Sequence, residues 1–288
     1  MPSFNDPVNR DEKTISHFGE EWQRFNYSDR SNLTVDLDYQ YKLYTQPLSR
    51  NVLGVNSVAA DFGAGSGRWA ERLLPEVGQL YLIEPSLNAF KVLESKFENS
   101  QKVILLNESI DKCSIPTESL DFAMSLGVLH HIPDTELALK KIFETLKPGG
   151  HFLGYLYYSF ENKNVAYRLT WRISDLARKI ISKSPSVIRK LICEAIAAAV
   201  YFPLARFARI IEIFGLPFLD IPLHHYRTLP FYMMRNDALD RFGTPLEQRF
   251  SKQQIRQMLL NCDADENSIR FSDSEPFWTF SANRVSTK

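Results

Sequence analysis

The sequence contains little cysteine. Its 288 residues include only Cys113, Cys193 and Cys262, which lie far apart and form no Cys-x-x-Cys pair. This spacing excludes a disulfide framework and predicts no metal site of the zinc type. Reduced thiols are typical of a cytoplasmic protein, which is the localisation we expect.

The sequence also lacks a surplus of charge and a long apolar run. Lys+Arg and Asp+Glu both number 34, so the formal net charge is +0. Nucleic-acid binders usually carry a basic surplus, and we therefore expect no nucleic acid as partner. No stretch reaches the roughly 20 apolar residues of a spanning helix. Residues 1–14 are polar and charged, so no signal peptide is expected.

Short apolar runs alternate with helical stretches between residues 57 and 157. We expect strands at 57–62, 79–83, 103–106, 120–126 and 151–157, with helices at 68–74, 86–97 and 134–146. Strands and helices in this order form parallel crossover units. A helix at 252–260 and strands at 268–271 and 276–283 then complete the sheet. The sequence predicts an α/β fold: a Rossmann-like, doubly wound, seven-stranded, mostly parallel sheet with a helical insert after the fifth strand.

Four regions follow from these patterns. Residues 51–159 form the expected core and residues 160–240 the insert, and residues 241–288 complete the sheet. Residues 1–50 read as an N-terminal helical arm with an aromatic group: Phe18, Trp22, Phe25 and Tyr27. This group either covers the ligand crevice as a lid or packs as ordinary core.

A glycine-rich turn follows the first expected strand. Asp61 is followed by glycines at 63, 65 and 67, with Ala64 between the first two. Such a turn lets the backbone approach a ligand closely, and the helix that follows offers free N–H groups. The dinucleotide fingerprint needs a third glycine or alanine at the position of Arg68, which argues against NAD.

Acidic residues end the next two strands. Glu84 lies 19 positions after Gly65, where a carboxylate can accept hydrogen bonds from both hydroxyls of a ribose. Glu108 follows the third strand and can accept a hydrogen bond from an adenine amino group, or it is a solvated loop acid. Both positions favour an adenosine ligand.

The combined motifs resemble those of class I S-adenosylmethionine-dependent methyltransferases. Residues 61–67 resemble the first motif of that family, and residues 81–86 resemble the second. Asn107-Glu108-Ser109 lies where the family usually has Gly-Asp-Ala, and residues 119–121, 128–132 and 146–152 resemble the fourth-strand region and the entry to the fifth strand. The similarity is closest to the small-molecule branch that includes ubiquinone and menaquinone methyltransferases.

The resemblance implies S-adenosylmethionine as cofactor and assigns its binding residues. Asp61 would orient the turn or reach the methionine ammonium, the three glycines would line methionine and ribose, and Glu84 would hold the ribose. Adenine would lie against Glu108 and Ser109. The expected cofactor-binding set is Asp61, Gly63, Ala64, Gly65, Gly67, Glu84, Pro85, Glu108, Ser109 and Leu126.

Three histidines are candidates for a general base, which an alcohol or phenol acceptor would need. We favour His225, which follows Pro222 near the end of the insert, with His130 and His131 at the end of the fourth strand as competitors. For each of the three, a packing role is the simpler alternative. Adjacent histidines rarely bind one metal, and no metal is expected.

The insert is basic and apolar. Between residues 165 and 190, seven Lys or Arg residues face a single acid, Asp175, and apolar residues recur at helical spacing. Such a segment either contacts a membrane surface peripherally or forms a cap whose apolar helices cover one another, which we favour.

The sequence thus predicts an enzyme that transfers the sulfonium methyl to an O, N or C nucleophile of a small molecule. The apolar insert of the chain is compatible with a lipophilic acceptor. An NAD-dependent oxidoreductase and a non-catalytic binding module on the same fold are the alternatives.

Overall fold

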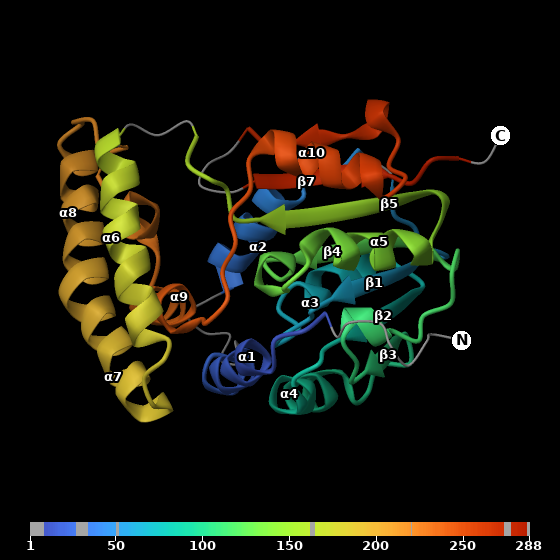
Figure 1. Cartoon of the computed structure of the whole chain (residues 1–288), viewed down its shortest axis with the longest axis horizontal. Helices are drawn as coiled ribbons and strands as arrows, with labels where there is room; N and C mark the ends of the chain where they lie inside the picture. Colours follow the sequence, from blue (N-terminus) through green and yellow to red (C-terminus); the bar gives the residue numbers. More distant parts are fainter. Residues whose placement is uncertain are drawn as a thin grey trace. The chain divides into compact units, whose positions relative to one another are not determined.

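The computed structural model describes residues 9–26, 34–49, 52–161, 165–219, 221–273 and 278–286, without the side chains of residues 34–36 and 166. Tyr27 of the N-terminal aromatic group lies outside these ranges. The chain divides into two units (Figure 1). The first comprises Met1–Asn26, Leu37–Asn162 and Leu246–Lys288, and the second comprises Tyr27–Asp36 and Lys163–Pro245.

A seven-stranded sheet forms the centre of the first unit, in the order β3-β2-β1-β4-β5-β7-β6. The first five strands are parallel to one another, and β7 is antiparallel to both β5 and β6. The predicted seven-stranded, mostly parallel sheet is therefore confirmed. The strands are β1 Val58–Phe62, β2 Gln79–Ile83, β3 Val103–Leu106, β4 Leu120–Leu126, β5 Leu146–Leu156, β6 Arg270–Phe271 and β7 Trp278–Asn283.

The connecting helices cover the sheet. They are α3 Ala70–Leu73 with the short helix η2 Leu74–Glu76, α4 Leu87–Phe97, η3 Ile110–Lys112, η4 Leu129–His131, α5 Thr135–Thr145, α10 Lys252–Asn261 and η7 Glu266–Ser268. The chain moves outward from β1 through β2 to β3, and in the opposite direction from β4 to β5. Right-handed crossovers then place α4 and α5 on opposite faces of the sheet. Phe62, Phe122, Phe152 and Phe280 are fully buried in the core.

Local chemistry sets several helix boundaries. Asp134 accepts from the backbone N–H of Leu137 and caps α5, and Ser251 with Gln254 forms a capping box at α10. The fifth strand begins earlier than the predicted 151–157. The strand begins at Leu146, and the Pro-Gly-Gly segment lies within β5, where the pairing with β4 shifts register between Leu120 and Phe122.

Two helices precede the sheet, α1 Glu12–Arg24 and α2 Thr34–Tyr44. Asp11 caps α1 by accepting from the N–H of Thr14. A Cβ atom at Gly19 would lie only 2.1 Å from Ser86 Oγ, so α1 passes very close to the beginning of α4. A larger residue at this position would force the two helices apart.

The second unit is helical. Its elements are α6 Val165–Ile181, α7 Ser186–Ile196, the π-helical turn η5 Ala197–Tyr201, α8 Phe202–Ile213, η6 His224–Thr228 and α9 Phe231–Gly243. Its core lies between η5, α8 and α9, where Ala197, Tyr201, Ala205, Met234 and Ala238 are buried together. Helices α6 and α7 both pack on α9.

Candidate functional site

The candidate site lies where the strand order of the sheet reverses. β1 and β4 are neighbours, and their connections leave in opposite directions. In open α/β sheets this point opens a crevice at the carboxyl ends of the strands. The glycine turn follows β1 and the segment Gly127–His131 follows β4, so both lie at this carboxyl edge of the sheet. Ser125 Oγ donates to the Phe62 carbonyl oxygen at 2.9 Å and ties the two strand ends together.

The glycines of the turn are required by its backbone. Gly63, Gly65 and Gly67 have φ of +82°, +56° and +73°, in the region that favours glycine. A Cβ atom at Gly63 would also lie 2.5 Å from the Val128 side chain. The N–H groups of Gly63 and Ala64 both donate to the carbonyl oxygen of Ile83, which holds the turn against β2.

The buried Glu84 side chain fixes the glycine turn. One carboxylate oxygen accepts from the Gly65 N–H at 3.0 Å and the other from the Ser86 N–H at 2.9 Å. Asn107 Nδ2 donates to the Glu84 carbonyl oxygen at 2.8 Å, which aligns the ends of β2 and β3. The sequence suggested neither contact, because both depend on which atoms the folded loops bring together.

Asp61 is a buried carboxylate with an unsatisfied oxygen. It is 2% exposed, and its Oδ2 has no hydrogen-bond partner among the described residues. Burial, and then the nearby Glu84, raise the pKa of Asp61 to about 8 against the opposing effect of Arg68. Burial raises the pKa of Glu84 to about 7. Two neighbouring carboxyl groups with raised pKa values are suited to a ligand that brings positive charge or hydroxyl donors.

Helix α1 lies over the glycine turn. A Cβ atom at Gly65 would lie 2.9 Å from Trp22 Nε1, so the indole ring is close to the turn. The Arg68 guanidinium lies 4.9 Å from the ring centre of Trp22 and 4.7 Å from that of Trp69. Arg68, which replaces the third glycine of a dinucleotide site, therefore lies close to two aromatic rings.

The remaining cofactor candidates lie at the ends of their strands. Pro85 follows Glu84, and Leu126 ends β4. The Glu108 carboxylate accepts from the Ser114 N–H at 2.7 Å, so it also stabilises its own loop. Ser109 is buried, and its Oγ has no partner in the described part of the chain.

The histidines differ in their surroundings. His130 is fully buried, its ring stacks on Tyr157 at 3.8 Å, and burial lowers its pKa well below the ordinary value. His131 Nδ1 lies 2.7 Å from the Leu246 carbonyl oxygen and donates to it, and Phe18 of α1 packs on its ring at 4.8 Å. His225 belongs to the second unit, and burial lowers its pKa to about 4.

Aromatic rings line the carboxyl ends of β4 and β5. Tyr155 packs against Tyr44 at 5.1 Å and Tyr157 at 5.8 Å, and Tyr44 packs against Trp69 at 5.1 Å. This cluster combines residues that are more than a hundred positions apart in the sequence. No local sequence pattern indicates that these residues meet.

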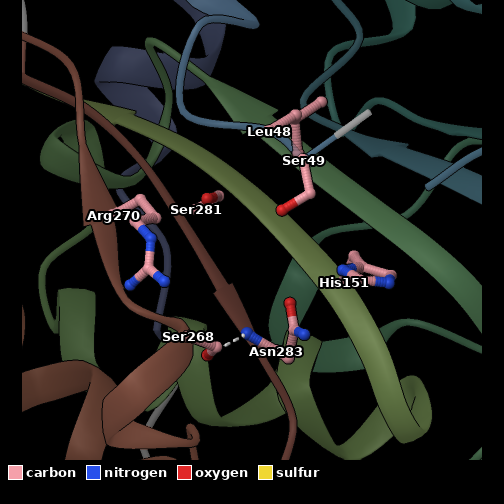
Figure 2. Close-up of a pocket in the computed structure, with 7 residues that line it drawn as sticks. All are labelled: Leu48, Ser49, His151, Ser268, Arg270, Ser281 and Asn283. Carbon is pink, nitrogen blue, oxygen red and sulfur yellow. Dashed lines mark hydrogen bonds between the residues drawn. The ribbon is translucent and has the colours of Figure 1, made fainter. Parts of the chain in front are cut away.

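A separate small pocket lies beside β5, β6 and β7 (Figure 2). It is lined by Leu48, Ser49, His151, Ser268, Arg270, Ser281 and Asn283. His151 is paired with Phe122 and Asn283, toward the amino ends of the parallel strands. The pocket is therefore distinct from the glycine turn. Among the described residues, no group of three or more His, Cys, Asp or Glu side chains could hold a metal ion.

Comparisons with known proteins agree with this geometry. Residues 60–154 match the family model of a methyltransferase domain. An uncharacterized methyltransferase of Geobacillus kaustophilus is 32% identical over 126 residues, which cover 42% of this chain and 58% of that protein. The match thus spans little more than half the length of this relative.

Two solved structures share the fold. The protein in complex with the Haloferax volcanii Trm112 methyltransferase activator superposes with a TM-score of 0.53 at 12% identity, covering 96% of this chain and all of that one. Human N-acetylserotonin methyltransferase, solved with S-adenosylmethionine, gives 0.52 at 13% identity, covering 93% of this chain and 57% of that one. The ubiquinone-like branch is not singled out and stays a prediction. In its methyltransferase-domain match, its sheet order and its glycine turn, the chain thus resembles the class I S-adenosylmethionine-dependent methyltransferases.

Proposed function

We propose that the chain binds S-adenosylmethionine at the turn 61–67 and transfers its methyl group to an O, N or C nucleophile of a small, lipophilic molecule. The observation that carries the proposal is the buried, unsatisfied Asp61 Oδ2 beside three glycines at positive φ. A cofactor with a cationic ammonium and sulfonium would satisfy this oxygen and lower the pKa of Asp61.

The chain's own residues would divide the binding between them. The glycines would allow close approach of the backbone, and Asp61 would attract the positive charge. Each Glu84 carboxylate oxygen accepts one backbone N–H, which leaves lone pairs for ribose hydroxyls. Ser109 Oγ would donate to, or accept from, the adenine. S-adenosylmethionine supplies an activated methyl group, so the remaining tasks of the protein are alignment and exclusion of water.

The acceptor proposal is supported by the aromatic cluster at the ends of β4 and β5. Rings such as Tyr155 and Tyr157 favour planar or apolar molecules and stabilise a nearby cationic methyl group. The neutral net charge of the chain does not favour a nucleic acid. Three free thiols support a cytoplasmic location.

Among the three histidines, we propose His225 as the general base for a hydroxyl acceptor. The two nitrogens of His130 are buried without hydrogen-bond partners in the described chain, and Nδ1 of His131 is held by the Leu246 carbonyl. Both arrangements favour a packing role. His225 is only partly covered, although its low pKa makes it a weak base.

The cofactor proposal is tested by calorimetric titration of S-adenosylhomocysteine into Asp61→Asn and Glu84→Gln variants. Each substitution keeps the shape of the side chain and removes a charge-assisted contact of about 1.5–3 kcal/mol, so affinity should fall roughly ten- to hundredfold. Asp121→Asn is the matched control, because Asp121 bonds Val58 N and Lys147 at the opposite end of the sheet. Wild-type affinity in both test variants would refute the site.

The acceptor proposal needs a separate measurement. The purified chain is incubated with methyl-labelled S-adenosylmethionine and a cell lysate, and the lysate is then separated into organic extract, RNA and protein. We expect the label in the organic extract. Label confined to RNA or protein would contradict a small-molecule acceptor.

A further inference from the structure

Exposed apolar side chains are concentrated in the second unit. Among the described residues, the large apolar side chains that are exposed outside positions 165–219 are only Tyr39, Val55, Leu87 and Val285. All the others lie on α6, α7, η5, α8 and the loop after α8. Such a concentration on a monomer marks an interaction surface.

Helix α6 carries the clearest stripe. Its exposed apolar residues recur at helical spacing: Val165, Leu169, Ile173, Leu176 and Ile180, each more than half exposed. The opposite side of α6 packs on α9, where Arg241 lies over Trp171 and donates to Ser174. At about 100° per residue, the stripe lies roughly opposite these two contacts. The expectation that the apolar helices of the insert cover one another is therefore wrong for this face.

Helices α7 and α8 repeat the pattern. Cys193, Ala197, Ala205 and Ala208 are buried on their inner side, whereas the outer side exposes Val187, Leu191, Phe207, Ile210 and Ile213. The segment Ser186–Ile213 is long and apolar enough to cross a membrane.

Its inner face nevertheless argues against a spanning helix. Glu194 forms an ion pair with Arg235, and Arg206 donates to the carbonyl oxygens of Arg227 and Leu229. Helix α9, which packs against this face, carries Arg235, Asp237, Asp240 and Arg241, and a helix with these charges is costly to bury in hydrocarbon. The arrangement suits a helix layer that lies flat, with one face in contact with lipid.

The charges beside the stripe define the lipid. Arg168, Arg172, Lys179 and Lys183 are exposed, and Asp175, the single acid of α6, is held by Arg178 and Lys179. Basic side chains bordering an apolar face are the pattern of helices that bind anionic membrane surfaces in the interfacial plane.

We propose that the second unit is a peripheral membrane-binding surface, in which the outer face of α6, α7 and α8 inserts shallowly into an anionic lipid bilayer. The basic residues beside the α6 stripe contact the lipid headgroups, and α9 remains on the water side. The enzyme would thereby work next to the phase in which a lipophilic acceptor is dissolved. Lipid binding itself does not depend on methyl transfer.

The test is vesicle co-sedimentation of the full chain, without cofactor. Wild type should bind vesicles of phosphatidylcholine with 30% phosphatidylglycerol, release at high salt, and bind pure phosphatidylcholine far more weakly.

The double variant Ile173→Glu, Leu176→Glu should weaken binding about tenfold or more, because it removes two apolar side chains from the lipid-facing surface. These side chains are 64% and 62% exposed, so their replacement should leave the fold intact. Arg168→Gln with Arg172→Gln should cost about fivefold per charge on anionic vesicles only.

Val55→Glu is the matched control, since Val55 is 73% exposed in the first unit. Circular dichroism verifies that each variant is folded. Failure of the wild type to bind anionic vesicles, or equal binding by the Ile173→Glu, Leu176→Glu variant, would overturn the proposal. A dimer in light scattering that this variant dissociates, without lipid binding by the wild type, would show instead that the face binds a second copy of the chain.

Discussion

Gly65 lies at a tightly packed point of the candidate site. Its φ is +56°, and any side chain there meets the Trp22 indole. We therefore expect Gly65→Val to lower the affinity for S-adenosylhomocysteine by at least about tenfold, measured by calorimetry. Gly215→Val is the control, because Gly215 also has a positive φ (+70°) but no atom within 4 Å of an added Cβ. Equal affinity of the two variants would place the cofactor elsewhere.

Asp61 and Glu84 should make the stability of the cofactor-free protein depend on pH. Their folded-state pKa values, about 8 and about 7, lie above the ordinary values of 3.8 and 4.5. Between about pH 4 and pH 8 the folded state therefore retains protons that the unfolded state has lost. The stabilisation is fully present below pH 4 and is lost as the pH rises through 7 and 8.

For Asp61 alone, this effect amounts to about 1 kcal/mol, or about 2 °C in Tm, for each pH unit in that window. We expect the Tm of the wild type to fall relative to Asp61→Asn between pH 5 and pH 8, measured by thermal shift without cofactor. Parallel curves for the two proteins would show that the carboxyl group of Asp61 is already ionised in the folded state.

His225 has a measurable signature as a base. With a pKa of about 4, its imidazole ring is neutral, and can accept a proton, at every pH above about 4. Once the acceptor is known, the acidic limb of the turnover profile should lie near pH 4, and His225→Asn should lower turnover by about 10²–10⁴-fold. His224→Asn, which alters the adjacent histidine, should change it little. If His225→Asn keeps the acidic limb of the profile, His225 is not the base, and the reaction depends only on the alignment of the acceptor with the methyl group.

At the scale of elements, α1 is the component that closes the turn. Trp22 contacts Gly65, Phe18 contacts His131, and both side chains come from this one helix. Trp22→Ala should weaken cofactor binding by about tenfold and increase hydrogen exchange at the Gly65 amide. Tyr39→Ala, which removes an aromatic ring that is 62% exposed on α2, should do neither. Unchanged hydrogen exchange at the Gly65 amide in Trp22→Ala would mean that the glycine turn is rigid without the Trp22 indole.

Element positions were largely predictable, whereas the contacts between elements were not. Short apolar runs such as Val58–Phe62 and Gln79–Ile83 indicate strands that are buried on both faces of a sheet. The same periodicity in α6 predicts a stripe but not its burial, which depends on whether another surface covers it. Trp22 and Asn107 reach the site only through the packing of distant segments, and no local pattern encodes that.

At the scale of the molecule, the second unit is inserted between two segments that are hydrogen-bonded to each other. Ser159 N donates to the Phe250 carbonyl oxygen, and Phe250 N donates to that of Tyr157. The Lys252 N–H also bonds the Glu161 carboxylate. The chain therefore leaves the sheet unit and returns to it at nearly the same place.

A short Gly-Ser linker can replace residues 163–245 on this basis. We expect the shortened protein to fold, to bind S-adenosylhomocysteine within about threefold of wild type, and to transfer no methyl group to the acceptor. Calorimetry and the labelled-methyl assay measure the two properties separately. A folded deletion variant that has lost cofactor affinity would show that the insert contributes to the cofactor site.

The antiparallel strand β7 has a consequence for biosynthesis. It is the partner of β5, yet about 120 residues separate the end of β5 from the start of β7. At a synthesis rate of roughly 5–20 residues per second, one edge of β5 stays without its partner for about 6–24 s. During this interval the nascent chain carries an open strand edge and the apolar helices of the insert together, both of which promote aggregation. A ribosome-bound chaperone should therefore be needed most while residues 157–277 are being translated.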